Sequence, residues 1–60
     1  MGLETHIEQL KIIIPEKDRV LDNQWLLNLR ISMSNNNHKD QKGIGQYDEL
    51  IKLIDEKLKG

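Results

Sequence analysis

The sequence predicts an all-α fold, a small three-helix arrangement that pairs as a dimer. Two observations predict it. Apolar residues recur every three or four positions in the first and last thirds of the chain. The chain has 60 residues and no cysteine, so no disulfide can stabilise a fold that buries only about 60% of its unfolded surface. We therefore expect a single domain spanning 1–60 that covers its remaining apolar surface by association with another chain.

The first predicted helix spans residues 3 to 14, approximately. Its apolar positions are spaced four, three and four: Leu3, Ile7, Leu10 and Ile14. Thr5 and Glu8 have the spacing of a capping box, in which each side chain accepts a hydrogen bond from a free amide of the first turn. Pro15 lacks an amide proton and disfavours a helical conformation in the residue before it. We therefore expect the helix to end before Pro15.

Two regular structures fit the central segment, about 16–33. Alternation in Gln24 to Met33 fits a strand, which would pair with Lys11 to Ile14 in an α+β fold that keeps only the C-terminal helix. As a helix, the segment has two apolar stripes. The first holds Leu21, Trp25, Leu29 and Met33 with Leu26 beside it, and the second holds Val20, Leu27 and Ile31.

Residue types and flanking residues favour the helix. Pro15 followed by Glu16 and Asp18 is typical of a helix opening, because proline suits the first turn and acids suit the positive end of the helix dipole. Leucine, glutamine, arginine and methionine also favour helix. In that case one stripe packs against the rest of the chain, and the other needs something else to cover it.

A polar loop of about 34–43 precedes the last predicted helix, of about 45–59. The loop is rich in asparagine and contains glycine, and we expect it to be a solvated connector. The helix has a heptad pattern: Ile44, Tyr47, Ile51, Ile54 and Leu58. Asp48 with Lys52, and Asp55 with Lys59, are acid and base four residues apart and in the favourable order.

No pattern in the sequence indicates catalysis, a cofactor or a metal. His6 and His38 do not have the spacing of a known metal-ligand set. Ser32 and Ser34 have no activating base nearby in the sequence, and the two glycines of the loop lack the context of a phosphate-binding motif. We therefore expect a protein that is not an enzyme and that needs no cofactor or metal.

The charge balance argues against a nucleic-acid or membrane partner. Nine basic residues face ten acidic ones, for a net charge of -1. The longest apolar run, Ile12 to Ile14, is too short for a membrane span or a secretory signal, so we expect the cytoplasm. Abundant isoleucine, lysine and asparagine without alanine are typical of AT-rich coding, as in low-GC bacteria and their phages.

One short segment is similar to a known family. Leu21-Asp22-Asn23-Gln24-Trp25, followed by Arg30 and Met33, resembles the Leu-Asp-x-x-Trp opening of the helical hook shared by the SinI and SinR antirepressor and repressor proteins of sporulating bacteria. The resemblance implies a helical hook that pairs with itself or with a related partner. It covers about a quarter of the chain, and here Asn28 stands where the family has a leucine.

These observations together predict a small cytoplasmic protein that binds and inhibits or regulates a larger protein through an apolar face. A DNA-binding or antirepressor-type transcriptional regulator and a scaffold or assembly subunit are the alternatives. Trp25 and Tyr47 are the expected anchors, because aromatic side chains supply large contact area at little entropic cost; for Trp25 the alternative is a place in the core. The full set of expected interface residues is Trp25, Leu29, Met33, Tyr47, Ile51 and Ile54.

Overall fold

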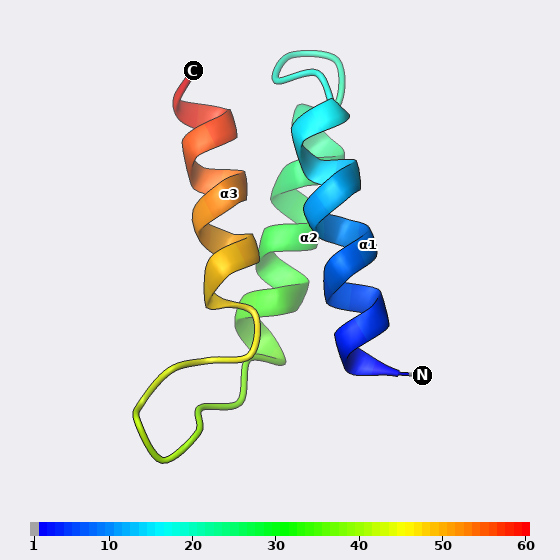
Figure 1. Ribbon diagram of the computed structural model, residues 1–60. Coiled ribbons are helices and arrows are strands. Elements are labelled where there is room, and N and C mark those ends of the chain that lie inside the picture. Colours follow the sequence, from blue (N-terminus) through cyan, green and yellow to red (C-terminus); the bar gives the residue numbers. More distant parts are fainter. Residues whose placement is uncertain (1) are drawn as a thin grey trace.

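The computed structural model describes residues 2–60 and contains three helices (Figure 1). They are α1 (Leu3–Glu16), α2 (Asn23–Asn35) and α3 (Asp48–Lys59). No strand is present among residues 2–60, so the all-α prediction is confirmed and the α+β alternative is wrong. Leu26 and Met33, both buried and seven positions apart, agree with the helix. A helix places them on one face, whereas a strand would place residues an odd number apart on opposite faces.

Helix α3 holds the fold together. It packs against both α1 and α2, whereas α1 and α2 have little contact with each other. Each helix supplies two side chains to the buried core: Leu10, Ile14, Leu26, Met33, Leu50 and Ile54. Because the first two helices reach each other mainly through α3, the core exists only when all three are in place.

Helix α1 differs from its prediction at both ends. The residue before it is Gly2, and no side chain caps its first turn, so the predicted capping box does not form. The helix also continues past Pro15 to Glu16. Proline removes only one amide there, and the Pro15 carbonyl, left free at the helix end, accepts a hydrogen bond from Lys57 Nζ at 2.6 Å.

Helix α2 begins at Asn23, seven residues after the predicted start. The acids expected to open the helix form a turn instead. Asp18 Oδ1 accepts hydrogen bonds from the amides of Val20 and Leu21, both at 2.7 Å, and the Asp18 amide donates to Asp22 Oδ2 at 2.9 Å. The amides of Leu21 and Val20 hold the pKa of Asp18 below its ordinary value. Local side-chain hydrogen bonds therefore compete successfully with helix formation over residues 17–22.

The segment between α2 and α3 is hydrogen-bonded rather than a loose connector. Asn37 Oδ1 accepts from the Tyr47 amide at 2.7 Å, and Asn37 Nδ2 donates to Asp48 Oδ1 at 2.7 Å. Gly45 is buried, and a side chain at that position would collide with Asn37. Lys39 and Gly45 form an isolated antiparallel bridge. Asn37 thus ties the end of α2 to the start of α3.

The molecule is flat and exposes more surface than its size requires. Its principal extents are 36 × 22 × 15 Å. The radius of gyration is 11.5 Å, against about 10.4 Å for a typical folded chain of 60 residues. The accessible surface is 4643 Å², against about 4,000 Å² for a typical folded monomer of 7.0 kDa. The core is correspondingly small.

Candidate interaction surface

The surface of α2 carries almost no charge. Among its 13 residues only Arg30 is charged, whereas seven of the 12 residues of α3 are charged. Arg30 is itself paired with Asp55 of α3, with an Nε–Oδ1 distance of 2.5 Å, and this hydrogen-bonded ion pair raises the pKa of Arg30. The side of α2 that faces solvent is therefore lined by amide, hydroxyl and apolar side chains.

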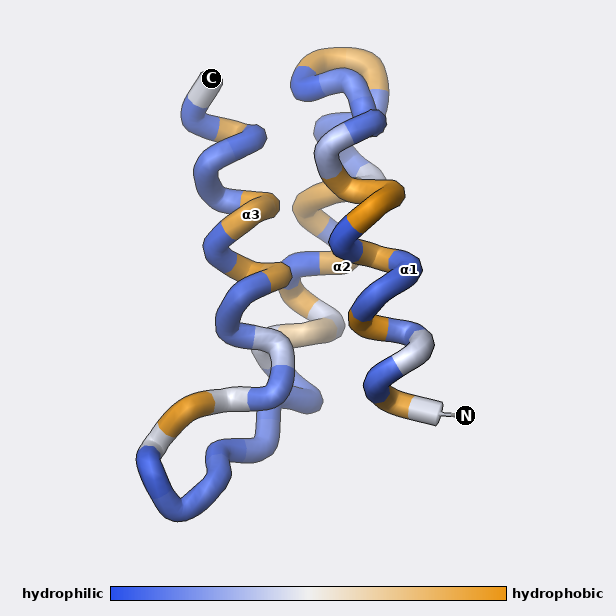
Figure 2. Tube along the Cα trace, in the orientation of Figure 1, coloured by the Kyte–Doolittle hydropathy of each residue, from blue (hydrophilic) through white to orange (hydrophobic). Residues whose placement is uncertain are grey.

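The same region concentrates the exposed apolar residues of the molecule. Nine large apolar side chains in residues 2–60 are more than a third exposed, and five of them lie between positions 20 and 31. Figure 2 shows apolar residues both along α2 and at the turn that precedes it. The five are Val20, Leu21, Trp25, Leu27 and Ile31. Scattered exposed apolar residues are ordinary, but a cluster on one element indicates a contact surface.

Two of these residues form an outer stripe on α2, defined as Leu27 and Ile31, and Val20 lies in the turn before the helix. At 3.6 residues per turn, Leu27 and Ile31 lie on the side of α2 away from Leu26, which is fully buried. Val20 is 71% exposed and Ile31 56% exposed. The outer stripe holds the two residues of the second predicted stripe that lie in α2, and the rest of the chain leaves them exposed.

The Trp25 flank is defined as Leu21, in the turn before α2, and Trp25, which lies on the side of α2 away from Leu27. Trp25 is 37% exposed, and Lys17 of the preceding turn lies over its ring, with Nζ 4.7 Å from the ring centroid. This is a cation–π contact. Leu21, in the turn that precedes α2, is 86% exposed, the most of any large apolar residue among residues 2–60. The ring is thus partly covered by a flexible lysine and is no part of the buried core.

The other five residues expected at an interface contribute to the fold of the monomer. Met33 and Ile54 are fully buried, so a partner could reach them only if the helices separated. Leu29, Tyr47 and Ile51 are half-buried and pack against the core. Only Trp25 remains open to a partner. The signal that points to the outer stripe instead is the absence of charge around it, which the sequence shows once the helix is placed.

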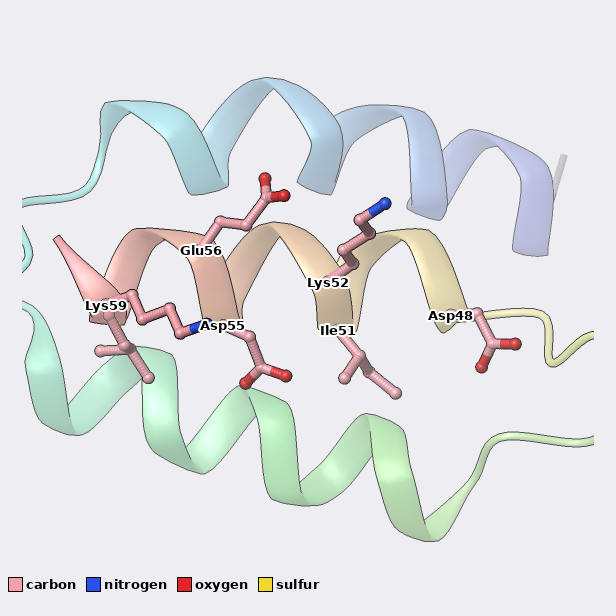
Figure 3. A pocket seen from close by; sticks show the side chains of 7 residues that line it. Asp48, Ile51, Lys52, Asp55, Glu56 and Lys59 are labelled. Atoms are coloured by element: carbon pink, nitrogen blue, oxygen red, sulfur yellow. The ribbon is translucent and has the colours of Figure 1, made fainter.

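Helix α3 presents a different, charged face. Figure 3 shows a surface hollow along it, with Asp55 pointing toward α2 and Glu56 toward α1. Its lining mixes acids, bases and two apolar residues: Asp48, Ile51, Lys52, Asp55, Glu56, Leu58 and Lys59. All of these come from one helix, so no second element closes the hollow. Such a lining is typical of a solvated helix face.

The ion pairs of α3 join it to α1 and α2, whereas the sequence predicted pairs along α3 itself. Asp55 pairs with Arg30, and Asp48 accepts hydrogen bonds from Asn37 and from the Gly45 amide. On the opposite side, Lys11 of α1 meets Glu49 Oε2 of α3 at 2.8 Å; this pair raises the pKa of Lys11 and lowers that of Glu49. The acids of α3 therefore fix its position relative to its neighbours.

The described residues show no constellation that fits a metal or a membrane span. Within residues 2–60, no three histidine or acidic side chains gather where they could hold a metal ion. No helix in the same range is long and apolar enough to cross a bilayer.

Comparison with known proteins gives no match to a protein-family model, a curated protein or a solved structure. The likeness of Leu21 to Trp25 to the SinI and SinR hook therefore remains a resemblance of one short segment. Any account of function depends on the surface of the molecule itself.

Proposed function

We propose that this chain is a small non-enzymatic cytoplasmic protein that binds a larger protein and inhibits or regulates it, using the Trp25 flank of α2. The observation that supports the proposal is the combination on α2 of exposed apolar side chains with no unpaired charge. Interface cores are depleted of charged residues and enriched in aromatic ones, because buried charges are costly to desolvate.

The exposed polar residues of α2 are not the types expected in a helix that only faces water. Asn28, Ser32, Ser34 and Asn35 are exposed helix positions, where lysine or glutamate would favour the helix more. Asparagine and serine are instead neutral polar groups that lose less on desolvation than charged groups. Their presence supports a helix that is covered by a partner during part of its working life.

Trp25 and Leu21 are the proposed anchors. Tryptophan is the residue type most often responsible for binding energy at protein interfaces, since a rigid ring buries a large area. Leu21 extends the same flank and makes little contact with its own chain, as its exposure of 86% shows. The matching partner surface is an apolar groove with few charges, able to replace Lys17 over the ring.

A matched pair of serine variants tests this proposal. Leu21→Ser removes an exposed side chain from the Trp25 flank, and Ile12→Ser removes one that is 66% exposed on α1. Each purified chain, with a photoreactive residue placed at the exposed position Ser32 on the Trp25 side of α2, is used to capture protein from bacterial extracts. We expect one protein to be cross-linked by the wild type and by Ile12→Ser but not by Leu21→Ser. Equal capture by all three chains would refute the proposed site.

The same surface offers little to nucleic acid. Phosphate binding needs cations, and the only cation of α2, Arg30, is engaged by Asp55. The basic loop residue Lys39 lies near Asp48 at the start of α3 and helps to lower the pKa of that carboxyl. The transcriptional-regulator and scaffold alternatives remain predictions of the sequence.

A further inference from the structure

We propose that the outer stripe is the contact between two copies of this chain, which pair antiparallel through α2 across a twofold axis. The inference goes beyond the proposed function, because the stripe and the Trp25 flank lie on different sides of α2. A dimer of this kind would leave Leu21 and Trp25 free on both copies.

The first argument is the area available. The chain exposes about 600 Å² more than a typical folded monomer of its mass. A standard stable interface buries roughly 800 Å² on each partner. This excess belongs to the whole chain and is of the same order as one side of such an interface, and the exposed outer stripe is an uncharged apolar part of the surface that a second copy could cover.

The second argument is charge. A twofold axis brings a surface against itself, so an isolated charge near the axis meets its own copy and is repelled. The outward side of α2 avoids this, because Arg30 is held by Asp55 and the remaining residues are uncharged. The outward side of α3 does not, since it carries Lys52, Glu56 and Lys59. Helix α2 is therefore the one best suited to pack against itself.

The third argument is the direction of pairing. In a parallel pair, the turns before α2 would come together and place Asp18 and Asp22 near their own copies. An antiparallel pair puts these turns at opposite ends and opposes the two helix dipoles favourably. With the axis level with position 29, Leu27 packs against the partner's Ile31, and Gln24 lies beside the partner's Ser34, within reach of an amide-to-hydroxyl hydrogen bond.

Lysine variants measured by sedimentation equilibrium test the stripe. We expect the wild type to reach twice its mass of 7.0 kDa as concentration rises. Ile31→Lys should weaken dimerisation by about tenfold or more, equivalent to about 1.4 kcal/mol, because it buries a charge opposite an apolar residue. Ile12→Lys, a similar change on α1, should leave dimerisation unaltered. Retained helical circular dichroism in both variants shows that folding is intact.

Cysteine cross-linking tests the direction of pairing. The natural chain has no cysteine, so single variants give unambiguous disulfides. Mixed Leu27→Cys and Ile31→Cys chains should cross-link faster than either variant alone.

Three outcomes of the sedimentation experiment would each overturn the dimer: a wild type that stays at 7.0 kDa at every concentration, an equal loss of dimerisation with Ile12→Lys, or open-ended oligomers. A dimer that persists in Leu21→Ser while capture of the larger protein is lost separates this inference from the proposed function.

Discussion

Helices α2 and α3 are almost equal in length but have opposite relations to the rest of the molecule. Helix α3 has a charged outer side, and its apolar side is covered by both other helices. Helix α2 has apolar residues on both flanks, and its own chain covers only the line that includes Leu26 and Met33. This difference indicates that α3 mainly stabilises the fold of the monomer. The composition of α2 indicates instead that another molecule covers part of this helix.

The largest expected effect is a difference in the free energy of unfolding between isoleucine-to-alanine variants of α3 and of α2. Ile54 in α3 is fully buried, and Ile31 in α2 is 56% exposed. We expect Ile54→Ala to lower the free energy of unfolding by about 2–5 kcal/mol, because it leaves a cavity between all three helices. Ile31→Ala should change it by no more than about 0.5 kcal/mol in the monomer. Urea denaturation, followed by circular dichroism at a concentration where the protein is monomeric, measures both.

The comparison between the helices would fail if the two isoleucine variants lost similar stability. That result would mean that Ile31 packs against its own chain. A cost of Ile31→Ala that appears only at higher protein concentration would instead support the dimer, because association stabilises the folded state in proportion to concentration.

An intermediate effect is expected for Trp25→Ala. Replacing a fully buried tryptophan costs about 3–5 kcal/mol, but the Trp25 ring is 37% exposed and is partly covered by a lysine. We therefore expect a loss below this range, about 1–2 kcal/mol, with the helical circular-dichroism spectrum retained. The variant should still lose the larger protein partner. Unfolding at room temperature would place Trp25 among the core residues instead.

Much of the fold could be predicted from the sequence, because apolar periodicity reports which side of a helix is buried. The three helices and four of the six core residues come from apolar repeats of three and four; Leu26 and Leu50 lie beside the repeats of their helices. The helix boundaries were harder to predict. Asp18 has the composition of a helix opening, yet its carboxylate satisfies two amides of a turn. The apolar periodicity of a sequence does not show where side-chain hydrogen bonds of this kind compete with the helix.

The candidate site was predicted only in part. The second stripe of the central segment was identified, but five of the six expected interface residues pack within the monomer: Leu29, Met33, Tyr47, Ile51 and Ile54. A pattern of apolar residues cannot tell which stripe its own chain will cover. Here the choice depends on where α3 lies, which is fixed by contacts such as Arg30 with Asp55 that join residues 25 positions apart.

The smallest expected effect concerns how the two helices begin. Helix α3 has acids in its first turn, and α2 has none. Asp48 accepts hydrogen bonds from the Gly45 amide and from Asn37, which hold its pKa below its ordinary value of 3.8. A lowered pKa in the folded state means that the carboxylate adds stability above about pH 3.8, and that this stability is lost as the pH falls through the lower, folded-state pKa.

We therefore expect acid to loosen the start of α3 as Asp48 takes up a proton. The chemical shift of the Gly45 amide, followed by nuclear magnetic resonance during a pH titration, should change with a midpoint below 3.8. The amides of Val20 and Leu21, in the turn before α2, should instead follow the titration of Asp18, and Asp48→Asn should leave that transition in place. Asp48→Asn should abolish the Gly45 transition and make the stability of the protein less dependent on pH. A Gly45 midpoint at or above 3.8 would mean that the hydrogen bond to Asp48 does not favour the charged carboxylate, and that the first turn of α3 is held by its neighbours alone.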